Sequence, residues 1–476
     1  MPLFLMETSI YPGGRIVELL NNYDFNSHIH LYSWKDLNIL LDVNSGAIHL
    51  LDGLSNLLLK NIIEYKGCID RAAEQTGRNF VPDDISEALI EFRSLQKQGA
   101  LFSEPEIPEV DLSSMKVKAI CLNVAHACNM KCEYCFAAQG NFGMKPALMS
   151  LATARQAMEF LLTNSGQIKN LEVDFFGGEP LLVADMLKEL VSYCREREKG
   201  TGKRFNFTLT TNAVLLEDEI IDWVIENDIS VILSLDGRKA TNDSCRILNN
   251  GEGTYDLIVP HIQRMVAQHP ISYFTRGTFT KKNLDFSKDL EHLIQLGFEC
   301  ISLEPAVGPD NGFSILEQDL PEVLAEYERL TEVLLENYML GKKIDFFHYD
   351  LSLQRGACLA KRVTGCGAGI EYLVITPEGD IYPCHQFVGD SDFYMGDIFD
   401  GIKYPHIRQN FANNQLKDKE CKDCWARYFC GGGCHASAYY RSMDLKKPHQ
   451  VSCAMHKKRI EGAIYLDLKK QIAGKM

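Results

Sequence analysis

The 476-residue sequence lacks the features that would place a protein in a membrane, outside the cell or on nucleic acid. It has no run of about 18 apolar residues, which a membrane-spanning helix needs. Residues 1–14 start with apolar side chains but have neither the basic region nor the cleavage site of a secretory signal. The net charge is -15, whereas phosphate backbones bind clustered Lys and Arg. We therefore expect a cytoplasmic protein with no membrane or nucleic-acid partner, and its length suggests two or three domains.

The first 120 residues are also poor in cysteine, because they contain Cys68 alone of the 16 cysteines in the chain. Two dense groups stand at residues 128–135 and 421–434. Thiols stay reduced inside the cell, so metal ligation is favoured over disulfides.

Residues 1–105 predict a small winged-helix-like domain. Two strands within residues 30–52 flank the turn Asn44-Ser45-Gly46, where glycine supplies the positive φ of a tight hairpin. Helical patterns follow at residues 54–65, 69–76 and 84–98, the last with Asp83 or Asp84 as N-cap. The closely spaced prolines of residues 104–108 predict a linker.

Residues 106–340 alternate strand and helix, which predicts a parallel sheet with right-handed crossovers. The predicted strands are residues 116–124, 171–175, 205–210, 230–235, 271–279 and 300–303, with helices such as 151–162, 184–197, 218–227 and 255–267. Polar and glycine-rich segments follow nearly every strand, at the end where β/α barrels build their active sites. The expected fold class is therefore α/β, a partial (β/α)6 barrel flanked by the N-terminal domain and a Cys-rich C-terminal domain, residues 341–476.

Cys128, Cys132 and Cys135 have the spacing C-x3-C-x2-C on the loop after the first barrel strand. Three thiolates on one loop can hold three irons of a cubane cluster and leave the fourth iron open. Zinc sites usually provide four ligands with C-x2-C pairs, so the spacing favours the cluster. Unrelated buried cysteines are the remaining alternative.

This motif, with Tyr134 before its last cysteine, resembles the radical S-adenosylmethionine (SAM) superfamily, and the resemblance covers residues 116–305. It implies that SAM binds beside the cluster, against residues from several strand ends. The implied contacts are the segment Gly177, Gly178, Glu179 and Pro180 at the amino group, Ser234 and Asp236 at the ribose, Asn212 at the same mouth, and Arg276 at the carboxylate. Each of these residues also has a simpler structural interpretation. The glycines can form an ordinary turn, Arg276 can be a surface or strand-pairing arginine, and Glu304 can be a polar residue at the barrel rim.

Seven cysteines of the tail have a spacing that resembles the SPASM domain, which binds two auxiliary four-iron clusters. The resemblance implies an outer cluster on Cys421, Cys424, Cys430 and Cys453, and an inner cluster on Cys366, Cys384 and Cys434. The fourth iron of the inner cluster is either held by Cys358 or open to a substrate thiolate. Gly431-Gly432-Gly433 predicts a tight turn that donates N–H groups to sulfur. Cys121, Cys194, Cys245 and Cys300 fit no motif and are expected in the core.

The N-terminal segment resembles the leader-binding element of ribosomal-peptide maturases, which captures a peptide as an added strand. A dimerisation or interdomain module is the alternative. Residues 135–150 and 41–52 resemble maturases of six-cysteine peptides and ranthipeptides, which join a cysteine sulfur to an acceptor carbon. The resemblance implies SAM, three [4Fe-4S] clusters, a Cys-containing precursor peptide and a flavodoxin- or ferredoxin-like electron donor. A formylglycine-forming sulfatase maturase and a non-catalytic electron carrier remain as alternatives.

Overall fold

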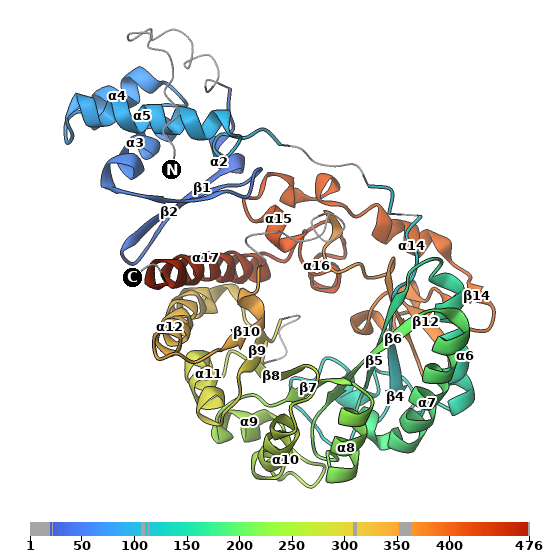
Figure 1. The fold of residues 1–476 in the computed structure, drawn as a ribbon. Coiled ribbons are helices and arrows are strands. Elements are labelled where there is room, and N and C mark those ends of the chain that lie inside the picture. Colours follow the sequence, from blue (N-terminus) through green and yellow to red (C-terminus); the bar gives the residue numbers. More distant parts are fainter. Residues whose placement is uncertain are drawn as a thin grey trace.

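The structure is a computed structural model that describes residues 20, 22–105, 110–112, 114–307, 312–351 and 363–474. Cys358 and part of the expected linker lie outside these residues. Figure 1 shows an N-terminal module beside a curved ring of strands and helices, with the tail closing part of that ring.

The N-terminal module contains a three-stranded antiparallel sheet and four described helices. The strands are β1 (Ile29–Trp34), β2 (Leu37–Asp42) and β3 (Ile48–Leu51), and the helices are α2 (Phe25–His28), α3 (Gly53–Glu64), α4 (Ile69–Thr76) and α5 (Pro82–Lys97). Gly46 has φ +73° in the β2–β3 turn, which confirms the predicted hairpin. The single strand predicted before this hairpin is split into β1 and β2 in the structure. The chain turns between them at Lys35, which takes φ +52° in a turn without glycine or proline.

The predicted cap of the third long helix is wrong. Val81 is the N-cap of α5 and Pro82 occupies its first turn. Proline fits there because its fixed φ is helical and its missing N–H has no helical acceptor. Asp83 and Asp84 lie in the first turn instead, where their charges favour the helix dipole.

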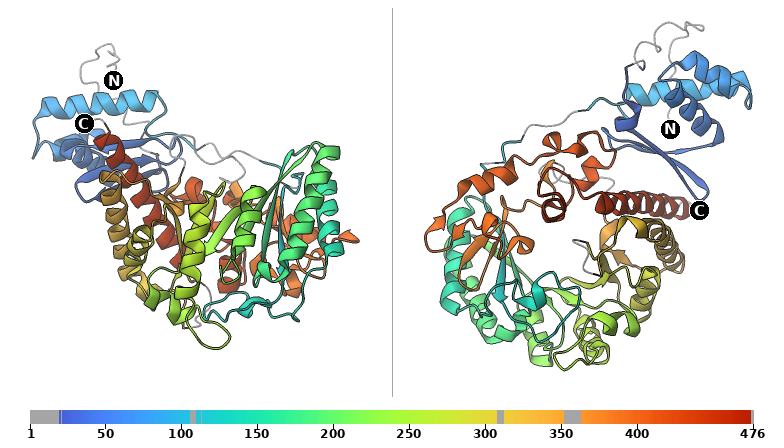
Figure 2. Two further views of the ribbon diagram at one scale, coloured as in Figure 1. Left: turned by 60° about the horizontal axis from the view of Figure 1, so that its bottom comes forward. Right: turned by 180° about the vertical axis from the view of Figure 1, so that it is seen from behind.

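The six predicted barrel strands are confirmed. They are β4 (Ala119–Ala125), β5 (Asn170–Gly177), β6 (Arg204–Thr211), β7 (Ser230–Ser234), β8 (Tyr273–Phe279) and β9 (Cys300–Pro305), each parallel to the next. The helices are α6 (Leu151–Asn164), α7 (Ala184–Thr201), α8 (Asp218–Glu226), α9 (Lys239–Cys245), α10 (Tyr255–Ala267), α11 (Phe286–Gln295) and α12 (Leu320–Met339). Figure 2 shows from two further sides that the helices lie outside the curved sheet.

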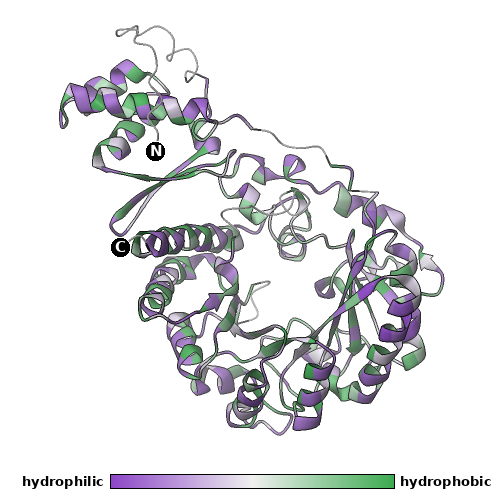
Figure 3. Ribbon diagram, in the orientation of Figure 1, coloured by the Kyte–Doolittle hydropathy of each residue, from purple (hydrophilic) through white to green (hydrophobic). Residues whose placement is uncertain are grey.

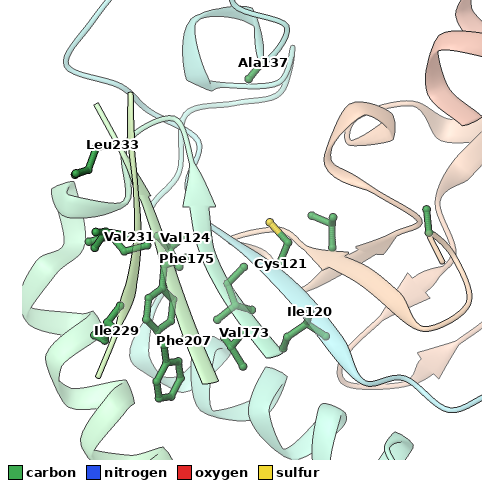
Figure 4. Close-up of a cluster of buried hydrophobic side chains, with 14 of the residues drawn as sticks. Ile120, Cys121, Val124, Ala137, Val173, Phe175, Phe207, Ile229, Val231 and Leu233 are labelled. Carbon is green, nitrogen blue, oxygen red and sulfur yellow. The ribbon is translucent and has the colours of Figure 1, made fainter. Parts of the chain in front are cut away.

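Alternation along the strands separates a hydrophobic outer layer from a polar interior. Val173, Phe175, Phe207 and Val231 are buried in the main core, and Figure 4 shows them close together on neighbouring strands. Figure 3 shows polar and apolar residues mixed along the outer helices, as helices with one buried face require. The opposite faces of the strands are left for the chemistry of the barrel interior.

The sheet extends beyond the six strands at both ends into one of eleven strands. At one end β10 (Asp345–Phe346) pairs parallel with β9. At the other end β11 (Tyr372–Ile375) pairs parallel with β4 and leads into the antiparallel β12 (Asp380–Tyr382), β13 (Gly396–Asp397) and β14 (Gly401–Ile402). The tail is thus joined to the barrel beside the strand that precedes the first cysteine loop. No local pattern in the sequence indicates this pairing of β11 with β4.

The remaining tail helices are α14 (Pro405–Ala412), α15 (Arg427–Cys430), α16 (His435–Ser442) and the long α17 (Gln450–Ala473). One face of the N-terminal sheet packs on α17 through Trp34, Ile39 and Leu41, which share a hydrophobic cluster with Ile460 and Ile464. Figure 1 shows β1 and β2 between the module's helices and α17. Within the described residues, no helix is long and apolar enough to cross a membrane.

Candidate functional site

The first cysteine loop lies against the glycine-rich segment that follows β5. The Gly178 N–H donates to the Ala125 carbonyl at 2.7 Å, and the Glu179 N–H donates to the Ala127 carbonyl at 3.0 Å. A Cβ on Gly178 would lie 2.0 Å from the Ala127 oxygen, and Gly177 has φ +135°. Both positions therefore require glycine, since the backbone of the cysteine loop occupies the space of a side chain.

The three thiols of this loop lie close enough to interact with one another. Burial raises the pKa of the Cys128 thiol to about 11, and Cys135 adds to the rise. Burial likewise raises the pKa of Cys132 to about 12, with further contributions from Cys135 and Cys128. The structure thus brings together the three cysteines that the motif singles out. Next to them, buried His126 has no partner for either ring nitrogen among the described residues.

Glu179 connects the ends of β5 and β6. It is fully buried, and its carboxylate accepts from the Thr211 hydroxyl at 2.8 Å, the Asn212 N–H at 2.8 Å and the Leu181 N–H at 3.0 Å. Burial raises its pKa to about 7 despite these bonds. The side chain is therefore occupied within the protein, and only the backbone of this segment faces the cysteine loop. Pro180 follows it, buried, at the start of a 3-10 turn.

Asn212 reaches the first cysteine loop directly. Its amide nitrogen lies 2.8 Å from Asn129 Oδ1 and 3.7 Å from Cys128 Sγ. The expectation that Asn212 shares the mouth with the cysteines is consistent with this position.

Asp236 has protein partners where the resemblance implied a ribose. It is 2% exposed, and its carboxylate accepts from the Tyr134 hydroxyl at 2.7 Å and from the Thr278 N–H at 2.9 Å. Buried Arg246 donates to the same hydroxyl at 3.0 Å. Asp236 therefore holds Tyr134, and with it the cysteine loop, against the end of β7. Sequence reasoning missed Arg246, which lies in no recognisable motif.

Arg276 and Ser234 lie side by side on the barrel wall, because they are register partners on β8 and β7. The Arg276 side chain is 43% exposed and its guanidinium lies 3.7 Å from Glu304 at the end of β9. Glu304 also lies 3.4 Å from His348, which follows β10. The three polar side chains form one charged wall of the interior.

This wall is completed by the tail. Arg459 of α17 donates to His348 Nδ1 at 2.8 Å, so the proton of neutral His348 lies on Nε2, toward Glu304 and Ser302. Burial lowers the pKa of His348 to about 4, which keeps the ring neutral. The guanidinium groups of Arg276 and Arg459, together with the N–H of His348, hold the pKa of Glu304 below its usual range in spite of burial. Sequence reasoning missed His348 and Arg459.

The tail cysteines form two groups. Burial raises the pKa of the Cys384 thiol, and the thiols of Cys434 and Cys366 add to the rise. Burial raises the pKa of Cys453 in the same way, with additions from Cys430, Cys421 and Cys424. These interactions lie within the inner and outer sets that the resemblance implied, and the ligand roles of these cysteines stay a prediction.

The glycine turn behaves as predicted. Gly431, Gly432 and Gly433 all have positive φ, and the N–H groups of Gly432 and Gly433 donate to the Cys430 sulfur.

The donor set of each group consists of cysteine thiols, which are the ligands of iron–sulfur clusters. Within the described ranges, no three His, Cys, Asp or Glu side chains converge as ligands of one metal ion would. Cysteines of a four-iron cluster bind separate irons and therefore stand apart from one another. All fifteen described cysteines are free thiols.

An aromatic contact joins the first loop to the inner cysteine group. The His385 ring lies parallel to Phe176, with centroids 5.2 Å apart and an interplanar angle of 16°. Phe136, which follows Cys135 and is 56% exposed, lies 5.1 Å from the same imidazole. Since His385 follows Cys384, the first and inner cysteine groups face a common aromatic surface.

Two family models match the chain. Residues 122–299 match the radical SAM superfamily, and residues 366–425 match SPASM, an iron–sulfur cluster-binding domain. An uncharacterized protein of Methanocaldococcus jannaschii is 28% identical over 317 residues, 66% of this chain and 96% of the relative. The mycofactocin maturase MftC of Mycobacterium tuberculosis is 25% identical over 341 residues, 69% of this chain and 81% of the relative.

Solved structures share the fold. The structure of anSMEcpe with bound AdoMet and the Kp18Cys peptide matches with a TM-score of 0.63 at 19% identity, covering 75% of this chain and 99% of that chain. Streptococcus suis SuiB bound to the precursor peptide SuiA matches with a TM-score of 0.51 at 16% identity, covering 89% and 98%.

Proposed function

From the radical SAM domain and the SPASM domain that this chain carries, we infer that it is an enzyme that modifies a ribosomally made precursor peptide. Domains of these two kinds bind SAM and iron–sulfur clusters. Relatives and structural neighbours named as a maturase or solved with bound peptides support the substrate class.

We assign the ligands by cysteine group. The first cluster takes Cys128, Cys132 and Cys135, the inner cluster Cys366, Cys384 and Cys434, and the outer cluster Cys421, Cys424, Cys430 and Cys453. The mutual electrostatic interactions within each group support three clusters. When bound, the first cluster and SAM supply a 5′-deoxyadenosyl radical that takes a hydrogen atom from the substrate.

The observation that carries the peptide assignment is the free edge of the N-terminal sheet. β3 pairs with β2 on one side, and among the described residues it has no strand on the other. Leu50 of β3 is 48% exposed. An exposed edge of this kind binds an extended peptide through backbone hydrogen bonds. We therefore assign β3 to the leader of the precursor.

The module directs the bound peptide toward the cysteine groups. Arg427, the first residue of α15, donates to the Ser27 carbonyl at 2.6 Å and to Asn44 Oδ1. His30 lies 2.9 Å from Glu461 of α17, the helix that also carries Cys453 and Arg459. These contacts fix the leader site relative to the tail, so the core of the peptide has a defined route into the barrel.

Inside the barrel the chain positions the reactants. We assign Arg276 and Ser234 to SAM, with the backbone of Gly177, Gly178 and Glu179 at its amino group. The Glu304–His348–Arg459 wall and the aromatic surface around His385 then face the peptide. They bind and orient it and keep water out, while the hydrogen transfer needs no classical general base.

The bond we propose is a thioether between a peptide cysteine and the carbon of an acceptor residue. The resemblance of residues 135–150 and 41–52 to six-cysteine-peptide and ranthipeptide maturases supports it. For each link the peptide loses the S–H and one C–H hydrogen. The deoxyadenosyl radical would accept one of them as a hydrogen atom, and the auxiliary clusters held by the tail cysteines would accept the electron left when the other departs as a proton. A flavodoxin- or ferredoxin-like donor supplies the electron that starts the cycle.

The test is to incubate the reconstituted, reduced enzyme and SAM with a precursor peptide whose gene lies beside the gene of the enzyme. The mass of the peptide product is then measured by mass spectrometry. Each thioether removes two hydrogens, about 2 Da. A leaderless peptide is the matched control and should react far more slowly. A product that has lost its sulfur would instead indicate formylglycine formation, and SAM cleavage without any peptide product would contradict the proposal.

A further inference from the structure

Lys419 is a buried lysine located between the two tail cysteine groups. It is 4% exposed, and its ammonium donates to the Gly432 carbonyl at 3.1 Å. Within the described part of the chain, the ammonium makes this one hydrogen bond, and no carboxylate lies within ion-pair distance of it. A buried ammonium with a single neutral acceptor costs stability unless negative charge is near.

The packing around Lys419 keeps it in this place. Gly432 has φ +94°, and a Cβ there would lie 2.8 Å from Lys419 Nζ, so glycine is needed for the ammonium to enter. Gly365, which precedes Cys366, packs against the same turn, since its Cβ would lie 3.3 Å from the Gly431 oxygen. The loops of the inner and outer groups therefore meet around the glycine turn that Lys419 contacts.

As cluster-bound thiolates, the cysteines would supply the missing negative charge. Burial lowers the pKa of Lys419, and the thiolates of Cys421 and Cys430 in the outer group and of Cys366 and Cys434 in the inner group oppose that shift. Exposed Lys422 lies next to Cys421 but faces solvent, where water screens its charge.

We propose that Lys419 is a counter-charge shared by the two auxiliary clusters and that it raises the reduction potential of both. This inference rests on the cluster assignment above. Reduction of either cluster adds one negative charge, and a fixed buried cation favours that change because little water screens it. Lys419 would act on electron transfer through the two auxiliary clusters, and not directly on SAM or on the peptide.

The test is a potentiometric titration of the full chain, monitored by electron paramagnetic resonance. Cys128→Ser, Cys132→Ser and Cys135→Ser remove the first cluster from the signal. Adding Lys419→Met, which keeps the length of the side chain but not its charge, should lower both auxiliary potentials. We expect the reduction equilibrium of each to shift about tenfold, which is about 59 mV for one electron. Lys422→Met is the matched control and should move them much less.

The outcomes separate this inference from the function. About eight iron atoms per chain in the variant that lacks the first cluster would show that it holds two clusters. With that iron present, unchanged potentials in Lys419→Met, or a shift equal to that of Lys422→Met, would overturn the role of Lys419. Iron well below that level in the variant that lacks the first cluster would overturn the cluster assignment instead.

A second measurement covers poor cluster loading in the variant. In the metal-free chain the buried ammonium lacks its anionic partners, so Lys419→Met should unfold at the same temperature or higher. In the loaded chain it should unfold at a lower temperature than the wild type. Destabilisation of equal size in both forms would show a purely structural lysine and contradict the inference.

Discussion

The imidazole of His30 lies parallel to the indole of Trp425, with ring centroids 3.6 Å apart and an interplanar angle of 4°. His30 belongs to β1 of the N-terminal sheet, and Trp425 follows Cys424 of the outer cysteine group. The stack therefore joins the sheet that carries the proposed leader site to the loop of the proposed outer cluster.

This stack predicts an energetic coupling between module and tail. His30→Ala and Trp425→Ala should each destabilise the chain, and the double variant should lose less than the sum, by about 1 kcal/mol. Chemical unfolding of the four proteins of this cycle measures the coupling. Additive effects would show that the stack contributes nothing to docking the module.

The edge strand predicts a backbone effect on leader binding. The Asp42 N–H donates to the Ala47 carbonyl, so these two residues are a hydrogen-bonded pair. Hydrogen-bonded and non-hydrogen-bonded pairs alternate along an antiparallel ladder, which makes Ile39 and Leu50 a non-hydrogen-bonded pair. The Leu50 N–H therefore faces away from β2. Leu50→Pro removes that outward donor without breaking the β2–β3 ladder. It should weaken leader binding, measured by fluorescence anisotropy, about tenfold, whereas Leu50→Ala should weaken it far less. Equal effects of the two substitutions would place the leader elsewhere.

The glycine contact predicts a selective loss of the first cluster. Gly178→Ala forces the cysteine loop away from β5 and should cost about 2 kcal/mol of stability. Iron should fall by about four atoms per chain, with the auxiliary clusters retained. Gly200→Ala in α7 is the control, since its Cβ meets no atom within 4 Å and should stabilise the chain slightly. Retention of all iron in Gly178→Ala would contradict the close approach.

The cysteine grouping predicts which substitutions act together. Cys421→Ser and Cys453→Ser should remove the same cluster, because both belong to the outer group. Cys366→Ser should affect a different one. Cys194→Ser, a buried cysteine of α7, should leave the iron content unchanged. Electron paramagnetic resonance of each variant shows which cluster signal is lost. If Cys421→Ser lost the same cluster as Cys366→Ser and a different one from Cys453→Ser, the grouping would be contradicted.

Asp174 of β5 predicts a pH dependence of stability in the metal-free chain. Burial, with a contribution from Glu172, raises its pKa from 3.8 to about 6. Because the folded-state pKa lies above the unfolded one, its stabilising effect is complete below about pH 4 and is lost as the pH rises through 6. Asp174→Asn should therefore become more stable relative to the wild type as the pH rises from 4 to 8, by about 3 kcal/mol at most. Urea unfolding at several pH values measures it, and a constant difference would exclude the titration.

Much of the fold could be predicted from the sequence, because local signals and global structure agree in the barrel. Strands such as β5 and β6 alternate between buried and more exposed residues, and polar segments follow nearly every strand at one end. The sequence could not predict what depends on distant pairing. β11 joins β4 although some 250 residues separate them, as their paired residues Tyr372 and Ala119 show. The turn at Lys35 was missed because a non-glycine residue takes a positive φ there without any sequence signal.

The site divides along the same line. The spacing of the cysteines indicated both tail groups, because the spacing within a motif can be seen directly in the sequence. Glu179 and Asp236 were expected to face SAM, but their carboxylates are occupied by Thr211 and Tyr134, and burial of this kind has no local signature. Arg246, His348, Arg459 and Lys419 were missed for a related reason. Each is a single polar residue that gains its partners only when separate elements pack.

The central claim is that this enzyme closes a bond between a peptide cysteine and a carbon of the same precursor. The most direct measurement is tandem mass spectrometry of the product after treatment with iodoacetamide. If a thioether forms, the peptide becomes about 2 Da lighter for each link, and its cysteine sulfur is retained, resists alkylation and lies at the crosslink. A product whose cysteines all alkylate, or one whose mass change lies at residues other than a cysteine and its acceptor, would contradict this claim.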